Sequence, residues 1–214
     1  YLLVEVETAQ GEPDDEGRIS LTFEVREGRK VNLKRIRFTG NTSFSEKKLR
    51  KQMKETKQDG WWFGGGMFKE EMYREDKKKI VEFYNKHGYR DAEIASDSLY
   101  YDENRKNLYI DIALREGPLY TFGTITWEGN EQIADPGLAS LVVAQEGIVY
   151  SSERIGKSLE QISSAYGDIG YIGASISRRE TPKEDHKIDL HFEIIENKPW
   201  KVRQIHITGN TKTK

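Results

Sequence analysis

The stretch Arg35-Ile36-Arg37-Phe38-Thr39-Gly40-Asn41 decides the fold of this chain, because the sequence repeats its pattern twice. The second copy is Thr124-Ile125-Thr126-Trp127-Glu128-Gly129-Asn130, and the third is Gln204-Ile205-His206-Ile207-Thr208-Gly209-Asn210. In each copy, apolar side chains stand nine, four and two positions before the glycine. Apolar residues at every second position that stop at Gly-Asn predict a β-strand with one buried face, followed by a turn.

The spacing of these copies sets the domain organisation. The glycines are 89 and 80 residues apart (129 − 40 and 209 − 129), a length typical of a small domain rather than a solenoid unit. A second ending recurs at the same offsets, as Arg-Glu-Gly at 26–28 and 115–117 and as Ile-Glu-Asn at 195–197. We therefore predict a C-terminal β-hairpin of a preceding repeat, two complete repeats and the first strand of a following repeat, at residues 1–28, 30–117, 118–197 and 199–214. Because Tyr1 begins within a strand-like run, we expect the chain to be an excised fragment.

Within each complete repeat the pattern reads strand, helix, helix, strand, strand. In the first repeat, either Ser43 or Ser45 can cap a short helix, and apolar spacings of seven and four predict a second helix over 70–86. In the second repeat, Asp135 followed by proline predicts a helix cap, and Ser151 predicts another. The fold class is therefore α+β.

The direction of the chain predicts the topology of each repeat. A helical hairpin returns the chain to the end of the sheet that it left, so the second strand runs antiparallel to the first. The third strand can then lie at the centre, parallel to the first, and the second strand becomes a free edge. Each repeat is thus predicted to be a three-stranded mixed sheet covered by two antiparallel helices.

Composition excludes several classes of function. The 34 basic and 36 acidic residues give a net charge of −2, which does not favour nucleic acid as a partner. The absence of cysteine excludes thiol chemistry and disulfides and is compatible with any compartment. The four histidines lack metal-ligand spacing, and no Ser/His/Asp set is discernible, so we expect no metal, no cofactor and no enzymatic activity. The charged run at 70–79 is expected to be a solvated helix face.

These repeats resemble POTRA domains in their strand order, in the Gly-Asn first strand and in a Tyr-x-x-x-Gly-Tyr turn. That turn stands here at 84–89 and again at 166–171. The resemblance implies the periplasmic, chaperone-like region of an outer-membrane β-barrel assembly factor, attached to the outer membrane through a C-terminal barrel that this fragment lacks. It implies two kinds of partner, unfolded outer-membrane proteins and accessory assembly lipoproteins. The alternative is the periplasmic arm of a TamA-like or two-partner secretion transporter.

The first candidate binding site is the middle strand of the first repeat. A free edge offers unpaired N–H and C=O groups, so a client peptide can add to it as a further strand. The alternative is an edge blunted by its two acidic residues. The predicted site comprises Ala92, Glu93, Ile94, Ala95, Ser96 and Asp97.

The second candidate is an aromatic loop between the two helices of the first repeat. Large apolar side chains on a glycine-containing loop are costly to expose, so they can form a docking surface for a partner or a contact with a membrane interface. The alternative is that the loop folds back over its own helices or a neighbouring domain. The residues concerned are Trp61, Trp62, Phe63, Met67 and Phe68.

Overall fold

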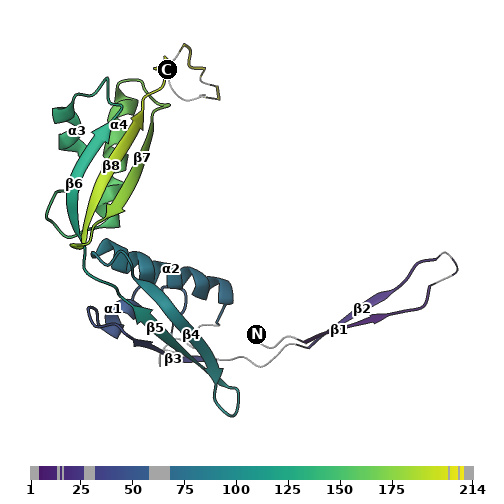
Figure 1. Ribbon diagram of the computed structural model, residues 1–214. Coiled ribbons are helices and arrows are strands. Elements are labelled where there is room, and N and C mark those ends of the chain that lie inside the picture. The colour runs from purple at the N-terminus through teal and green to yellow at the C-terminus, as the bar shows by residue number, and fades with distance from the viewer. Residues whose placement is uncertain are drawn as a thin grey trace. The chain divides into compact units, whose positions relative to one another are not determined.

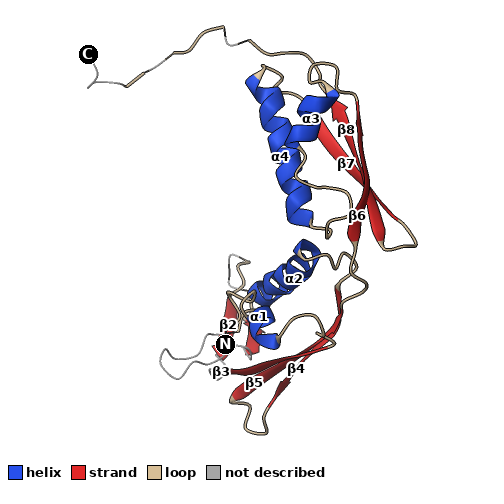
Figure 2. Cartoon of the chain, turned by 90° about the vertical axis from the view of Figure 1, so that its left-hand side faces the viewer, coloured by secondary structure: helices blue, strands red, loops and turns tan. Residues whose placement is uncertain are grey.

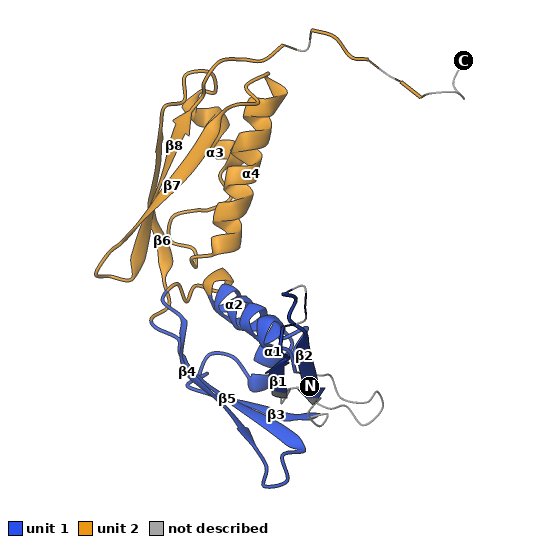
Figure 3. Cartoon of the chain, turned by 90° about the vertical axis from the view of Figure 1, so that its right-hand side faces the viewer, with its two compact units in different colours: residues 1–84, 91–117 blue, residues 85–90, 118–214 orange. Residues whose placement is uncertain are grey.

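The structure is a computed structural model that describes residues 5–13, 15, 17–26, 32–57, 68–201, 203–206 and 208–209. The chain divides into two compact units, residues 1–84 with 91–117 and residues 85–90 with 118–214 (Figure 3). The turn at 85–90, which the sequence pattern assigns to the first repeat, belongs to the second unit. There the Gly88 carbonyl accepts a hydrogen bond of 2.9 Å from the backbone N–H of Tyr120.

The first unit contains a three-stranded sheet in the order β3-β5-β4 (Figure 1). Its central strand β5 (Asn107–Arg115) runs parallel to β3 (Asn32–Thr39) and antiparallel to β4 (Glu93–Tyr101). The helices α1 (Glu46–Arg50) and α2 (Glu70–Lys86) connect β3 to β4. Every second side chain of β5 is buried in the core of this unit, namely Leu108, Ile110, Ile112 and Leu114.

The second unit repeats this arrangement with strand order β6-β8-β7. Its central β8 (Lys187–Ile195) runs parallel to β6 (Thr121–Glu128) and antiparallel to β7 (Ser175–Pro182). The helices α3 (Asp135–Leu141) and α4 (Ser152–Asp168) cover one face of the sheet (Figure 2). The core between helices and sheet includes Phe122, Leu138, Ile155, Ile162, Tyr166, Leu190 and Phe192. Both units confirm the predicted α+β fold with a mixed sheet and a central third strand.

The two recurring sequence motifs meet at one end of each sheet. They are the Gly-Asn turn after the first strand and the Glu-containing end of the third strand. Gly40 has φ +77°, and a Cβ there would clash with the carbonyl oxygen of Leu114, two residues before Glu116. The Glu116 carboxylate accepts hydrogen bonds from Thr42 Oγ1 at 2.5 Å and from the backbone N–H and hydroxyl of Ser43 at 3.0 and 2.8 Å. The Tyr84 hydroxyl donates a further bond of 2.9 Å to it.

The second unit forms the same junction with different residues. Gly129 has φ +84° and approaches the Ile194 carbonyl as closely as Gly40 approaches Leu114. Glu196 Oε1 accepts hydrogen bonds from the backbone N–H groups that follow Gly129-Asn130 and, at 2.8 Å, from the Tyr166 hydroxyl. The glutamate therefore ties the turn after the first strand and the end of the second helix to the end of the third strand.

One predicted helix start needs correction, and the predicted serine caps lack their side-chain hydrogen bonds. Ser45 is the N-cap of α1 and makes no side-chain capping bond, whereas Ser43 is held by Glu116. Helix α3 has Ala134 as its N-cap, so the prediction that Asp135 is the cap is wrong by one residue. The Asp135 carboxylate instead accepts hydrogen bonds of 2.9 Å from Trp127 Nε1 and from Asn130 Nδ2. Ser151 is the N-cap of α4 and makes no side-chain capping bond.

The hairpin at the start of the sequence is exposed, although apolar residues at every second position are typical of a strand with one buried face. Strands β1 (Glu5–Gln10) and β2 (Leu21–Arg26) pair antiparallel, with Thr8 opposite Phe23. Phe23 is 62% exposed. A half-buried strand needs a covering layer, and the helices of the described residues lie within the two complete repeats.

The third Gly-Asn phrase is not a strand in its described residues, 203–206 and 208–209. Gly209 nevertheless has φ +82°, like the glycines of the other two copies. In both complete repeats the first strand pairs with the third strand of the same repeat. Among the described residues, no strand follows this stretch.

Candidate functional site

The outer edge of β4 is the candidate binding site. Among the described residues, no strand pairs with this edge, because β4 is the last strand of the sheet. Ala95 and Ser96 are exposed on it, whereas Ala92 precedes the strand and is buried. The strand that carries the other five predicted residues begins at Glu93 and extends to Tyr101.

A β-bulge at Ala95 reorients the side chains of β4. Ile94 lies opposite Leu114 and Ser96 opposite Ala113, so Ala95 has no partner in the register. The extra residue places Ile94 on the same side as Asp97, the side on which β5 presents its buried residues to α2. Without the bulge, strict alternation would turn these two side chains to opposite faces.

A groove of about 520 Å³ runs between this strand and α2. Ile94 and Val81 supply its apolar part, and Asp97 lies on the strand side. The α2 side carries three cations and one carboxylate, namely Arg74, Lys77, Lys78 and Glu82. The groove therefore combines an unpaired backbone edge with an apolar strip and a mixed but mainly basic rim.

Both acidic residues of the edge have a partner within the unit. Glu93 forms an ion pair with Arg115. Asp97 accepts hydrogen bonds from Lys77 Nζ at 3.0 Å and from the Tyr73 hydroxyl at 2.8 Å. Burial of the Asp97 carboxyl acts to raise its pKa, but these two donors outweigh burial and hold the pKa below its ordinary value.

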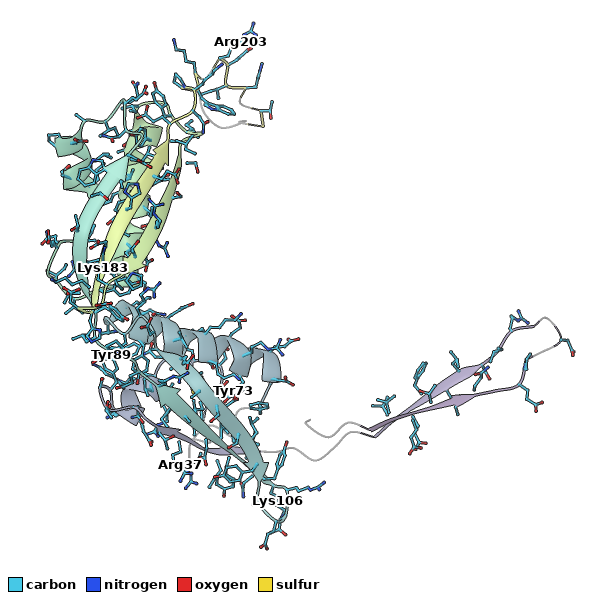
Figure 4. The ribbon with its side chains drawn as sticks, in the orientation of Figure 1. Arg37, Tyr73, Tyr89, Lys106, Lys183 and Arg203 are labelled. Atoms are coloured by element: carbon cyan, nitrogen blue, oxygen red, sulfur yellow. The ribbon has the colours of Figure 1, made fainter. Side chains whose placement is uncertain are left out.

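Tyr73 links the edge strand to the core. Its ring is buried, and Figure 4 shows it on α2, on the side of the sheet opposite Arg37. Burial, followed by the hydrogen bond to Asp97, raises the pKa of the Tyr73 hydroxyl far above its ordinary value. The hydroxyl therefore stays protonated and donates to Asp97 at physiological pH.

The corresponding edge of the second unit has different chemistry. Its strand β7 pairs with β8 without a register shift and ends at Pro182, which has no N–H to offer. The position opposite Phe192 is Arg178, and Glu180 follows opposite Leu190. These two side chains form an ion pair at 2.9 Å, and the Tyr150 hydroxyl donates to Glu180 at 3.0 Å.

At the other edge of the second sheet, the start of β6 is paired with its own chain. The backbone of β6 exchanges hydrogen bonds with the segment before α4, from Gly147 N–H to Phe122 O at 2.8 Å and from Phe122 N–H to Ile148 O at 2.9 Å. Thr121 and Val149 add an antiparallel bridge. The first two residues of β6 are therefore already paired on this side.

The aromatic loop can be assessed at one residue. Phe68 is buried, with 8% of its surface exposed, and its ring centroid lies 5.5 Å from that of Tyr73. Phe68 thus packs against its own helix α2, as the alternative interpretation of the loop expects for this residue. Four of the predicted loop residues lie outside the described residues, namely Trp61, Trp62, Phe63 and Met67.

The expectation that the charged run at 70–79 is a solvated helix face is wrong at Asp76. It is fully buried and accepts hydrogen bonds from the backbone N–H groups of Glu55 at 3.0 Å and Thr56 at 2.7 Å. Burial acts to raise the pKa of Asp76, but the Thr56 N–H and Lys79, whose Nζ is 3.1 Å away, outweigh it and lower the pKa. Asp76 holds the segment after α1 against α2.

The described residues offer little for other chemistry. Among them, no group of three or more His, Asp or Glu side chains is placed to hold a metal ion. No helix in this part of the chain is both long and apolar enough to cross a membrane.

A family model confirms what the repeats indicate. The model described as POTRA, surface antigen variable number repeat, matches residues 31–117 and 120–197. The chain therefore belongs to the POTRA family, with two tandem copies of the domain.

Similarity to individual proteins narrows the comparison within this family. The outer membrane protein assembly factor BamA of Neisseria meningitidis is 28% identical over 201 residues, which cover 92% of this chain and 25% of that protein. BamA of Neorickettsia risticii is 26% identical over 207 residues, which cover 94% of this chain and 28% of that protein. This chain thus spans about a quarter of the length of these curated relatives.

A solved structure shares the fold. The crystal structure of POTRA domains 3–5 of Haemophilus influenzae BamA matches with a TM-score of 0.66 at 23% identity, covering 86% of this chain and 73% of that one. The chain is a BamA-like POTRA segment in its sequence and in the fold of its repeats.

Proposed function

We propose that this chain is a periplasmic part of an outer-membrane protein assembly factor, and that its first unit binds extended client segments by adding them to β4 as a fourth strand. The observation that carries this proposal is the unpaired edge of β4 beside the α2 groove, with its acidic side chains already partnered. The similarity to BamA proteins supports the assembly factor over a secretion transporter.

The binding free energy expected for strand addition suits a protein that binds many different clients. Each backbone hydrogen bond contributes roughly 0.5–1.5 kcal/mol net, and ordering a peptide offsets part of that. A few such bonds with modest apolar contact give affinities of roughly millimolar to micromolar. Binding of this kind is weak and tolerant of sequence, as recognition of unfolded outer-membrane proteins requires. Accessory lipoproteins are the second class of partner that we propose, and the parent protein holds this region at the outer membrane.

The binding mode predicts the effect of a proline at the bulge. Ala95 has no partner in the β5 register, so Ala95→Pro leaves the strand pairs of the sheet in place while its ring obstructs the outer edge. In a titration of the 214-residue chain with a fluorescent peptide of alternating apolar and polar residues, Kd should rise at least about tenfold.

Two controls make this test specific. Ala95→Ser keeps the N–H and should bind like the parent chain, and circular dichroism should show that both variants are folded. A peptide with N-methylated backbone amides should bind poorly to the unaltered chain, because it cannot complete a ladder of hydrogen bonds. Equal affinity for Ala95→Pro and the parent would rule out strand addition at β4.

A further inference from the structure

A second cavity of the first unit lies beside β3, the strand at the other edge of the sheet. It has a volume of about 330 Å³, near the lower end of the range for ligand pockets. Ile36, Met53 and Thr56 are buried and line it from β3 and from the segment after α1. The remaining lining residues are all cationic, namely Lys47, Arg50, Lys51 and Lys57.

The excess of positive charge belongs to this cavity and not to the chain as a whole, whose net charge is −2. Arg50 is engaged, because its Nη1 donates to Glu46 Oε2 at 2.6 Å and to the Ile36 carbonyl at 3.3 Å. The three lysines are exposed, and among the described residues none of them has an ion-pair partner within 4.0 Å. Three cations beside an apolar floor are therefore available to a partner.

The clustered positive charges lower the stability of helix α1 itself. Lys47 and Lys51 stand four residues apart, where like charges on a helix repel each other, and α1 has only five residues. The second unit shows that the fold does not require these charges. When Leu49 is matched to its buried counterpart Leu138, the positions of Lys47, Arg50 and Lys51 become Pro136, Ala139 and Ser140.

We propose that this cavity binds an acidic segment of a partner protein, which inserts one apolar side chain between Ile36 and Met53 and places carboxylates on the surrounding lysines. A membrane surface fits less well. Proteins that bind membranes through an interface project their apolar side chains outward, whereas here the apolar residues are recessed and 1–2% exposed. The cavity receives an apolar group, so the partner must supply it, and the cationic rim selects a segment with negative charges on either side.

The proposal is tested by titrating the 214-residue chain with three labelled peptides. The first carries one leucine flanked on each side by two glutamates, the second replaces the glutamates by lysines, and the third replaces the leucine by alanine. The first should bind at least about tenfold more tightly than the second and about fivefold more tightly than the third. Its Kd should rise with salt concentration, since exposed charges are screened.

Charge reversal assigns the binding to this cavity. Lys47→Glu with Lys51→Glu, and separately Lys57→Glu outside the helix, should each weaken the glutamate peptide, the double variant by about tenfold or more. Lys106→Glu, in the exposed turn between β4 and β5, is the matched control and should change Kd less than about twofold (Figure 4). The single Lys57→Glu keeps the test valid if the double variant does not fold.

Three outcomes would overturn the proposal. Equal affinity for the glutamate and lysine peptides would show that charge does not select the ligand. Unchanged affinity in both the double variant and Lys57→Glu would place the binding elsewhere on the chain. Lysine-dependent binding to phosphatidylglycerol vesicles without binding of the glutamate peptide would assign the cavity to an anionic lipid surface. None of these outcomes depends on strand addition at β4, whose test uses a different peptide and a different variant.

Discussion

Glu116 explains why the Gly-Asn phrase and the Arg-Glu-Gly ending recur at the same spacing. One carboxylate holds the turn after the first strand, through Thr42 and Ser43, and the end of α2, through Tyr84. Glu196 makes the equivalent bonds in the second unit. The two phrases recur together because they form one junction, and this junction is structural rather than a recognition site.

Neutralising Glu116 should destabilise the first unit in a pH-dependent way. Burial acts to raise the pKa of this carboxyl, but hydrogen bonds from Thr42, Ser43 and Tyr84 outweigh it and lower the pKa. The stabilisation is therefore fully present above the unfolded-state pKa of about 4.3 and is lost as pH falls through the lower folded-state value. We expect Glu116→Gln to reduce the free energy of unfolding by about 2 kcal/mol at neutral pH.

Denaturant titrations between about pH 7 and pH 3 would check this linkage. The difference between Glu116→Gln and the parent chain should begin to shrink below about pH 4.3, where the unfolded parent takes up a proton, and should vanish once the folded carboxyl is also protonated. A difference that stays constant across this range would show that the charge on Glu116 does not contribute.

Gly40 is the residue of the junction that tolerates substitution least. Gly40→Ala adds a Cβ at φ +77° that clashes with the Leu114 carbonyl. Gly147→Ala is a matched control, since Gly147 has φ +80° and nothing within 4 Å of an added Cβ. The control should lose about 1–2 kcal/mol of unfolding free energy from backbone strain alone, and Gly40→Ala should lose clearly more. Equal losses by chemical denaturation would contradict the close approach.

At the scale of elements, the second helix of each unit fastens the segment that follows the first helix. Asp76 accepts from the N–H groups of Glu55 and Thr56, and Ser158 Oγ accepts from the N–H of Val143 at 2.9 Å. Both polar side chains are buried, so losing either leaves backbone N–H groups without acceptors.

We expect removal of this contact to lower the free energy of unfolding by different amounts in the two units. Asp76→Ala removes a charged acceptor from two backbone N–H groups, of which that of Thr56 is buried, and should lower the free energy of unfolding by about 3 kcal/mol. Ser158→Ala removes a neutral acceptor and should cost about 1 kcal/mol. Denaturant midpoints of the two variants measure this contrast. A cost for Asp76→Ala no larger than that for Ser158→Ala would contradict the role given to the carboxylate.

The sequence predicts the elements well because their periodicity reports burial directly. Helix α2 has its predicted bounds, and the strand order follows from the direction of the chain. The bulge at Ala95 and the burial of Asp76 leave no such trace, because both depend on which residue of another element lies opposite. The cationic cavity beside β3 is also hidden, since it combines a strand residue with residues that follow in the chain.

At the scale of the whole molecule, one fold is used twice with different surfaces. The POTRA repeats share their sheet order and their glutamate junction, yet β4 offers a bulged edge beside a groove, whereas β7 carries an ion pair and ends at Pro182. In a repeated domain of this kind, the residues that maintain the fold are distinct from the surface residues that differ between copies. The core residues maintain each unit, and we propose that the edges and cavities determine what each unit binds.

Amide hydrogen exchange with and without the alternating peptide tests the central claim most directly. A strand added to β4 would form hydrogen bonds with its outer edge and slow exchange there. We predict peptide-dependent protection within Glu93–Tyr101 and unchanged exchange within Ser175–Pro182. Protection confined to Ser175–Pro182, or binding without protection of Glu93–Tyr101, would contradict strand addition at β4.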